Sequence, residues 1–418
     1  MEEITKVEQA DMDDTKKNTE RNPVIDRIVY IISGLTLLLS IGMLVYCIRT
    51  LNDVSMLNKE YKKTIDESAE LAITLNEIRS LQAQYGLSMD YNIEDCEYNA
   101  IAGYLYAMGD KYAGYHDPDM YTEQVRSDNE DGLGIGVVVQ GRENGILITK
   151  VYQNTPAEQV GLQRFDLIVG VEDTEYTIAK YNDILSLMRG KAGDIIRLSI
   201  LRDGEPMTIE VMIAEYTISS VEGKLIGDIA LIDIDDFTLK SAVEFRNVMD
   251  KYKAEGIEKY IIDLRNNTGG FLDTVVDMVD YMVPEGVIVQ VSDNKGNIVS
   301  EIKSDKQEFT GKAVVLTNRW TASASELFAQ SMKDFGKATI IGENTYGKGT
   351  VLSTFDLSNG GAVSISTGYY LTNSGAQLEG IGVKPDIEIN YENMSYGDYF
   401  TIPEESDIQL HEAIKFLS

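Results

Sequence analysis

The first hydrophobic feature of the chain is an uninterrupted apolar run near its N-terminal end. Residues 28–48 read IVYIISGLTLLLSIGMLVYCI and contain no charged side chain, and Arg27 and Arg49 flank them. A helix of this length crosses a hydrocarbon core of about 30 Å. The preceding 27 residues are long and acidic for a signal peptide, and no A-x-A cleavage site follows. The pattern therefore favours an uncleaved membrane anchor over the alternative, a cleaved signal peptide.

A polar stretch with helical periodicity follows the apolar run. Its apolar residues recur at mostly helical spacing, at Leu57, Tyr61, Ile65, Leu71, Leu75, Ile78 and Leu81. This spacing predicts a stalk or a dimerising helix over about 54–85, and a solvated spacer is an equally compatible interpretation. A second helix is expected over 96–111, with its end near Gly109 and Asp110.

The pattern changes to short strands with glycine punctuation between Gly132 and about Tyr216. Strands are expected over 134–139, 145–151 and 195–201, and a helix over 181–188 that Gly190 stops. These elements predict a small β-rich domain with one or two helices.

From Ile226 onward, strands alternate with helices. Strands are expected over 260–264, 313–317 and 338–341, and helices over 274–282 and 324–335. This alternation predicts parallel strands in an α/β layer. The fold class is therefore an α/β (α+β) multidomain chain with a single N-terminal transmembrane helix. The expected divisions are a tail (1–27), an anchor (28–48), a helical region (49–120), a β-rich domain (121–216), an α/β domain (217–398) and a C-terminal helical segment (399–418).

Composition and charge narrow the possible functions. The chain has 418 residues, with 68 acidic and 37 basic side chains and a formal net charge of −31. Such a chain repels a phosphate backbone, so no nucleic-acid partner is expected. Only two cysteines (Cys47, Cys96) and two histidines (His116, His411) are present. A disulfide framework and a His- or Cys-based metal site are therefore implausible, and no metal is expected.

The charges around the apolar run leave the membrane orientation open. Lys16, Lys17, Arg21 and Arg27 precede the run, and Arg49, Lys59, Lys62 and Lys63 follow it, so the two sides tie. The short tail and the large following domain favour a tail inside the cell and the bulk of the chain outside. The missing disulfides suit an extracytoplasmic compartment that does not depend on them, as in many Gram-positive bacteria.

The segment 321–326, TASASE, offers the first candidate chemistry. Ser323 and Glu326 have the spacing of a helix-capping box, which is the purely structural interpretation. A serine at a strand-to-helix turn is also well placed as a nucleophile, because backbone N–H groups there stabilise an oxyanion. A nucleophilic serine needs a base, and the sequence contexts of both histidines are unpromising. A lysine is therefore the leading candidate.

The segment 342–349, GENTYGKG, provides that lysine. It resembles a phosphate-binding P-loop, but Gly349 stands where a hydroxyl residue belongs, and the strand-like residues 351–355 follow instead of a helix. An ATPase is therefore a weak alternative. Lys348 lies 25 residues after Ser323 (348 − 323 = 25), beyond one helix and one strand, so the crossover returns it to the same sheet edge. An exposed turn lysine remains the plain interpretation.

Two glycine-rich segments complete the candidate sites. The segment 263–270, DLRNNTGG, follows a predicted strand, and its glycine pair could supply an oxyanion donor or form a simple turn. The segment 132–136, GLGIG, runs into a strand, whereas a dinucleotide fingerprint opens a helix. Its amides could form a nest for a peptide's C-terminal carboxylate, and a plain glycine turn is the alternative.

Together these residues resemble the C-terminal processing peptidases, also called tail-specific proteases. Five segments match the family in order: 100–110, 155–161, 263–270, 321–326 and 347–349. The segment 380–386 also resembles the closing strand segment of the family. The resemblance covers roughly residues 95–418.

The resemblance implies a membrane-anchored serine endopeptidase with a Ser–Lys dyad and no metal or organic cofactor. It assigns residues 121–216 to a PDZ domain that recognises substrate C-termini and residues 217–398 to a peptidase core of the ClpP/crotonase type. Ser323 is then the nucleophile and Lys348 the general base. The backbone N–H of Ala324 and one from the Gly269–Gly270 pair would form the oxyanion hole. The PDZ loop that binds the peptide C-terminus would be Leu133, Gly134, Ile135 and Gly136.

Two positions depart from the family pattern. Leu352 stands where many relatives have a glutamine that orients the lysine amine, and Phe165 stands where the PDZ module usually has glycine. We expect a slow but real peptidase acting on proteins or peptides with accessible C-termini, with a homodimer as a further possibility. The alternative is a catalytically weak or inactive, membrane-anchored PDZ adaptor that binds peptide C-termini.

Overall fold

The computed structural model describes residues 23–87, 91–129, 131–305 and 309–418 of the chain. These residues divide into two compact units, Met1–Ile93 and Glu94–Ser418, which are taken in turn. The expected tail, residues 1–27, lies mostly outside the described residues.

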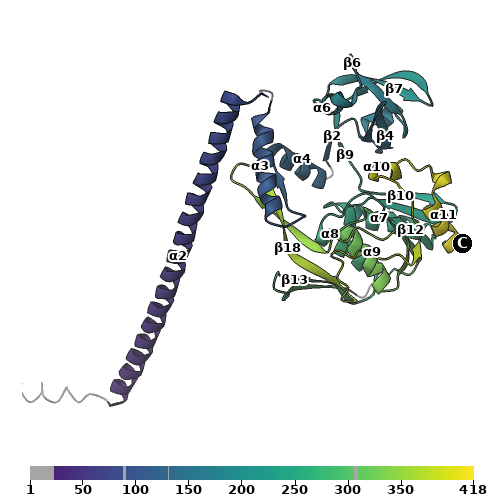
Figure 1. The fold of residues 1–418 in the computed structure, drawn as a ribbon. Coiled ribbons are helices and arrows are strands. Elements are labelled where there is room, and N and C mark those ends of the chain that lie inside the picture. The colour runs from purple at the N-terminus through teal and green to yellow at the C-terminus, as the bar shows by residue number, and fades with distance from the viewer. Residues whose placement is uncertain (1–22, 88–90, 130, 306–308) are drawn as a thin grey trace, which may run out of the picture. The chain divides into compact units, whose positions relative to one another are not determined.

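The first unit contains one long helix, α2 (Pro23–Tyr85), drawn in purple and blue in Figure 1. The predicted anchor and the predicted stalk therefore form one continuous helix, since no proline interrupts the sequence between Pro23 and Tyr85. Within α2, Leu35–Lys63 is long and apolar enough to cross a membrane, by length and composition. Stalk residues such as Leu57, Leu71 and Leu75 have exposed side chains.

The second unit holds all the described sheets. Its helices are α3 (Ile93–Ala107), α4 (Pro118–Asp128), α5 (Pro156–Gln159), α6 (Tyr181–Arg189), α7 (Ser241–Ala254), α8 (Leu272–Met282), α9 (Ala324–Asp334), α10 (Tyr396–Tyr399) and α11 (Ile408–Leu417), with 3₁₀ turns η1 (Ile178–Lys180) and η2 (Glu404–Ser406). The expected helix over 96–111 is α3, which ends four residues earlier than predicted, before Gly109 with its φ of 86°.

The β-rich region forms its own sheet around its own core. The strand order is β3 (Val137–Arg142), β4 (Gly145–Val151), β5 (Leu167–Val171), β7 (Ile195–Arg202) and β8 (Glu205–Met212), with β6 (Thr174–Glu175) paired to β5. Ile146, Ile148, Ile168 and Leu198 are fully buried in this core, and Ile184 of α6 packs among them. Helix α6 ends at Gly190, as predicted.

The predicted strand over 134–139 is interrupted in the structure. Strand β2 (Asp131–Gly134) ends at Gly134 and pairs with β9 (Ala214–Thr217), and β3 begins only at Val137. The cause is the backbone of two glycines, with φ of 147° at Gly134 and 88° at Gly136. A Cβ on Gly136 would lie 2.2 Å from the Cβ of Thr155, so no larger residue fits there.

The α/β region is built on a second six-stranded sheet. Its order is β10 (Val221–Ile226), β11 (Ile229–Ile234), β12 (Lys259–Asp263), β15 (Lys312–Thr317), β16 (Ala338–Gly342) and β19 (Ile387–Glu388). All neighbours are parallel except β10 and β11, which confirms the predicted parallel layer. Helices α7, α8 and α9 cover one face, where they share a core with buried residues such as Tyr260 and Val315, and α11 covers the other (Figure 1).

A third sheet packs against the outer side of α8 and α9. Its order is β1 (Gly114–His116), β18 (Ala362–Thr372), β13 (Gly286–Ser292) and β14 (Ile298–Ser304), and β17 (Thr350–Asp356) also pairs with β18. The segment 380–386, expected to be part of a closing strand, is instead a turn and extended chain that leads into β19. Gly380 and Gly382 have φ of 72° and 77°, and Pro385 has no N–H to donate to a ladder.

Candidate active site

Ser323 occupies the turn between β15 and α9, as the strand and helix pattern predicts. Its φ of 58° and ψ of −119° are unusual for a residue other than glycine. Such strained backbone costs about 1–3 kcal/mol and persists where surrounding contacts hold it in place. The side chain of Glu326 accepts the Ser323 N–H at 2.8 Å, which confirms the expected capping box.

The same Glu326 carboxylate also holds the loop of Lys348. Its Oε2 accepts the N–H of Lys348 at 2.8 Å, and its Oε1 accepts the N–H of Gly347 at 2.7 Å and the hydroxyl of Thr345 at 2.5 Å. The Glu326 side chain is fully buried. Burial raises its pKa, and hydrogen bonds from Thr345, Lys348, Gly347 and Ser323 act in the opposite direction. One buried carboxylate thus fixes the backbone of both candidate residues.

A tyrosine makes a second bridge between the two candidate residues. The hydroxyl of Tyr370, on β18, lies 2.9 Å from the carbonyl oxygen of Ser323 and also bonds the carbonyl oxygen of Lys348. Ser323 and Lys348 are therefore joined through both their N–H and their C=O groups, which fixes the spacing of the two backbones.

Lys348 follows β16 in a loop beside Ser323. Strands β15 and β16 are parallel neighbours, with Thr317 opposite Gly342, so the crossover does return the chain to the same sheet edge. The next element is the strand β17, which confirms that the segment is not a P-loop leading into a helix. Burial of the amine lowers the pKa of Lys348 below its ordinary value, although the charges of Asp110, Glu326 and Glu379 oppose this. A lowered pKa is what a lysine base requires.

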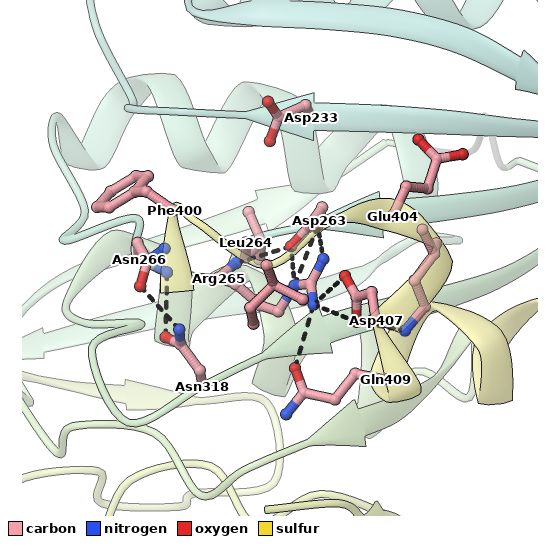
Figure 2. Close-up of polar contacts among 12 residues, drawn as sticks. Asp233, Asp263, Leu264, Arg265, Asn266, Asn318, Phe400, Glu404, Asp407 and Gln409 are labelled. Carbon is pink, nitrogen blue, oxygen red and sulfur yellow. Dashed lines mark hydrogen bonds and ion pairs between the residues drawn. The ribbon is translucent and has the colours of Figure 1, made fainter. Parts of the chain in front are cut away.

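The loop 263–270 is anchored at its start by a buried ion-pair cluster. Figure 2 shows Arg265 between Asp263 and Asp407, with its Nη2 at 2.6 Å from Asp263 Oδ2 and its Nη1 at 2.8 Å from Asp407 Oδ2. The side chains of Asn266 and Asn318 bond each other at 2.8 Å in the same view. These contacts hold the loop against the β15–α9 turn.

Asn267 connects the second half of the loop 263–270 to helix α9 by hydrogen bonds. Its Nδ2 donates to the carbonyl oxygen of Ile234 at 2.7 Å, and its Oδ1 accepts the Ser325 hydroxyl at 2.8 Å. The same oxygen accepts the N–H of Gly269 at 2.9 Å. The loop therefore reaches the Ser323 turn in one fixed arrangement.

The glycine pair of this loop lies directly against Ser323. A Cβ on Gly269 would lie 2.8 Å from Ser323 Cβ and 2.9 Å from the nitrogen of Ala324, so only glycine permits this approach. The Gly269 N–H is already bonded to Asn267. Within the described part of the chain, no hydrogen bond is recorded from the N–H of Gly270 or of Ala324.

Other residues that sequence reasoning singled out lie elsewhere. Leu352 is half-buried on β17, opposite Ser366 of β18. His116 bonds the hydroxyl of Ser364 at 3.1 Å, outside the contacts that join Ser323 to Lys348. Phe165 has a φ of 77°, which explains why glycine suits this position.

Sequence reasoning missed three residues that build this site. Tyr112 and Tyr370 stand in no predicted motif, and Asn267 stands in the loop 263–270 without an expected role of its own, because each acts through a contact with a distant segment. Glu326 was predicted only as a helix cap, and its hydrogen bonds to the Lys348 loop were not foreseen. A signal existed for Asn267 alone, since it lies inside the predicted glycine-rich loop.

Comparisons with known proteins identify the families that the two regions of this chain resemble. Residues 228–389 match peptidase family S41, and residues 133–213 match a PDZ domain. The "Probable CtpA-like serine protease" of Staphylococcus epidermidis ATCC 12228 is 30% identical over 396 residues, which cover 90% of this chain and 77% of that protein. The protein of the same name from Staphylococcus haemolyticus is 29% identical over 354 residues, covering 82% and 70%.

A solved structure gives the same result for the fold. A candidate S41 protease from Bacteroides fragilis has a TM-score of 0.56 and 16% identity, over 74% of this chain and 87% of that one. With the glycine loop beside Ser323 and the buried link to Lys348, these matches define a serine-type peptidase with a PDZ domain. The chain belongs to peptidase family S41, and within it to the CtpA-like C-terminal processing proteases, whose substrates are peptides and proteins.

Proposed function

We propose that Ser323 is the nucleophile of this peptidase and Lys348 its general base. The observation that carries the proposal is the double link between the two residues, in which Glu326 accepts both N–H groups and Tyr370 bonds both carbonyls. The strained turn of Ser323 at the start of α9 supports the same assignment. The lowered pKa of Lys348 supports its role as base.

The reaction then proceeds by acyl transfer. The neutral Lys348 amine takes the proton of the Ser323 hydroxyl, and the oxygen attacks the carbonyl carbon of the scissile bond. The lysine returns that proton to the leaving amine, which gives an acyl-enzyme and releases the C-terminal fragment of the substrate with a new N-terminus. Lys348 next removes a proton from water, and the water oxygen attacks the ester. Lys348 returns that proton to the departing Ser323 oxygen, which releases the new substrate C-terminus and restores the enzyme.

We further propose that the N–H groups of Ala324 and Gly270 stabilise the oxyanion. Both lack a recorded acceptor among the described residues, whereas the Gly269 N–H is bonded to Asn267. Gly269 contributes in another way, because its missing side chain lets the loop approach Ser323. Preorganised donors of this kind are usually the largest single contribution to catalysis.

Substrate recognition is assigned to the loop Leu133, Gly134, Ile135 and Gly136. Strand β3, which follows this loop, is at the edge of the PDZ sheet, so an extended peptide can add alongside it. We propose that the loop amides bind the terminal carboxylate of the substrate. The proposed divisions of the chain are those expected from sequence, with the PDZ domain at 121–216 and the peptidase core at 217–398.

Cleavage of an unfolded fluorescent peptide with an apolar C-terminus tests the dyad. Ser323→Ala and Lys348→Ala should each abolish cleavage while peptide binding persists. Ser331→Ala is the matched control, because this α9 hydroxyl is buried without a partner among the described residues. Peptide binding without any Ser323-dependent cleavage would instead support the adaptor alternative.

We also propose a single-pass membrane protein whose bulk lies outside the cell. The apolar window of α2 supports an anchor, and its exposed apolar positions after residue 54 support a homodimer through the stalk. Protease added to intact cells should degrade the region after Arg49 and spare an epitope placed before Arg27. The reverse pattern, or a cleaved N-terminus, would refute this topology.

A further inference from the structure

The amine of Lys348 faces an aromatic ring. Its Nζ lies 5.1 Å from the ring centroid of Tyr112, a residue in the segment after α3. Over the described ranges, no hydrogen bond or ion pair to this amine is recorded. The lysine side chain has four rotatable bonds, and the backbone links to Glu326 and Tyr370 leave those bonds free. Among the described residues, the Tyr112 ring is therefore the one specific contact recorded for this amine.

The Tyr112 ring is held by contacts with residues on both sides of Lys348 in the sequence. Its hydroxyl lies 3.3 Å from the carbonyl oxygen of Gly347 and 3.1 Å from Glu379 Oε1. Glu379 in turn accepts the N–H of Gly349 at 2.9 Å and pairs with Lys111 at 2.8 Å. The tyrosine is thus tied to both residues that flank the lysine.

The backbone of Tyr112 is fixed by a second carboxylate. Asp110 Oδ1 accepts the Tyr112 N–H at 3.0 Å, and the same side chain accepts the N–H and the hydroxyl of Ser366 at 2.7 and 3.0 Å. Ser366 belongs to β18, the strand that also carries Tyr370. Residues 110–112 are therefore bonded to the rest of the domain at both ends, through Asp110 and through Tyr112, and the Tyr112 ring lies over the lysine amine.

We propose that Tyr112 is a positioning residue of the peptidase, whose ring covers the Lys348 amine and holds it in one direction. This inference rests on the proposed role of Lys348 as the base. The face of an aromatic ring attracts the ammonium form of lysine, and the ring also excludes water, which favours the neutral form. Burial is the largest influence on the Lys348 pKa, so the exclusion of water is the larger of the two effects. A ring that is tied to both neighbours of the lysine cannot move away without breaking those bonds.

The charges around the amine determine what loss of the ring would do. The charges of Asp110, Glu326 and Glu379 raise the pKa of Lys348, and burial lowers it by more. Removal of the ring admits water and weakens the effect of burial, whereas the three carboxylates remain. The pKa of Lys348 should then rise, and a smaller fraction of the amine would be neutral at pH 7.

The test measures kcat/KM of the full chain for one unfolded peptide as a function of pH. The range of about pH 6 to 10 includes both shifted and ordinary lysine pKa values. In Tyr112→Ala the acid limb should move up by about one pH unit, which lowers the rate at pH 7 about tenfold. Tyr112→Phe keeps the ring but loses the hydroxyl bonds that hold it, so its acid limb should lie between those of the parent and of Tyr112→Ala. Tyr121→Phe is the matched control, because it also removes a tyrosine–carboxylate bond, to Asp356 (2.8 Å).

The outcomes separate this inference from the proposed function. Cleavage that survives in Lys348→Ala would refute the dyad itself. An inactive Lys348→Ala together with a parental limb in Tyr112→Ala would refute the role of Tyr112 alone. A limb that moves equally in Tyr112→Phe would show that the hydroxyl and not the ring is responsible, which also overturns the proposal. If Tyr112→Ala does not fold, Tyr112→Leu replaces the ring by an apolar side chain and makes the same comparison.

Discussion

At the residue scale, the proposed dyad depends on a side chain that takes no part in the proposed chemistry. Glu326 receives four donors, and two of them are the N–H groups of Ser323 and Lys348 on one oxygen, Oε2. An ionised carboxylate can accept at both oxygens, whereas an amide has one accepting oxygen and one donating nitrogen. For holding these four donors, the number of accepting oxygen atoms on the Glu326 side chain is therefore more important than its charge.

Glu326→Gln should accordingly slow cleavage without changing peptide binding. The amide nitrogen would face at least one N–H donor and push the Ser323 turn or the Lys348 loop aside. A displacement of 1 Å in a catalytic group costs about 100-fold in rate, so we expect kcat to fall roughly 10- to 100-fold at unchanged KM. Steady-state kinetics on the unfolded peptide measures this.

Glu343→Gln provides the control for that loss. Glu343 is also buried, and it pairs with Arg319 at 2.8 Å and accepts the Tyr391 N–H at 2.9 Å, but it makes no recorded contact with Ser323 or Lys348. It should lower the melting temperature and leave kcat unchanged. Equal kcat losses in both variants would mean that general destabilisation, and not displacement of the dyad, causes the effect.

At the element scale, the sequence predicts what depends on local pattern. Strands such as β12, β15 and β16, and helices such as α6 and α9, follow from periodicity and from the glycines that stop them. The order of strand, serine turn, helix, strand and lysine loop also places two candidate residues on one sheet edge. Two neighbouring parallel strands that are joined by a helix can be connected in few other ways.

The parts that were not predicted depend on contacts between distant segments. Tyr112 bonds Gly347 across 235 residues, and Ser325 bonds Asn267 across 58. Periodicity carries no signal for such pairs, because neither partner interrupts or continues a local element. The break in the strand near Gly134 was missed for a related reason, since an alternating apolar pattern continues through Ile135 although the backbone turns there.

At the scale of the whole molecule, the PDZ sheet meets the peptidase core through charged side chains. Lys150 of β4 pairs with Asp235, and its Nζ lies 3.4 Å from Asp233 and 3.8 Å from Glu222. Arg142 of β3 pairs with Asp398 at 3.2 Å. A cavity of about 620 Å³ lies along this contact, and neither Ser323 nor Lys348 lines it.

The carboxylates around Lys150 outnumber it. Burial and the charge of Asp235 raise the pKa of Asp233, and burial raises the pKa of Asp235 and of Glu222, although Lys150 opposes each shift. The same three carboxylates raise the pKa of Lys150 despite its burial. One ammonium group thus allows three acidic groups to remain close together at neutral pH.

Lys150→Met should therefore destabilise the folded chain most at neutral and alkaline pH. Loss of one partner from a buried ion pair costs about 3 kcal/mol or more, and the unpaired carboxylates then repel one another. Their pKa values would rise further in the folded variant, above the ordinary values of 3.8 for aspartate and 4.5 for glutamate. Between those values and the raised ones, the folded variant binds more protons than the unfolded chain. Its stability must then increase as the pH falls.

Thermal unfolding of parent and variant at a series of pH values above and below neutrality checks this expectation. The difference in melting temperature should be largest at neutral and mildly alkaline pH and should shrink as the pH falls through the raised pKa values of the carboxylates. Lys224→Met is the matched control. The Lys224 and Glu404 side chains, which form an ion pair, are 56% and 51% exposed, so the pair contributes little to the free energy of unfolding. A deficit in Lys150→Met that is independent of pH would mean that Lys150 acts by packing alone. A deficit as large in Lys224→Met would show that loss of a lysine charge in general, and not loss of the buried cluster, lowers the stability.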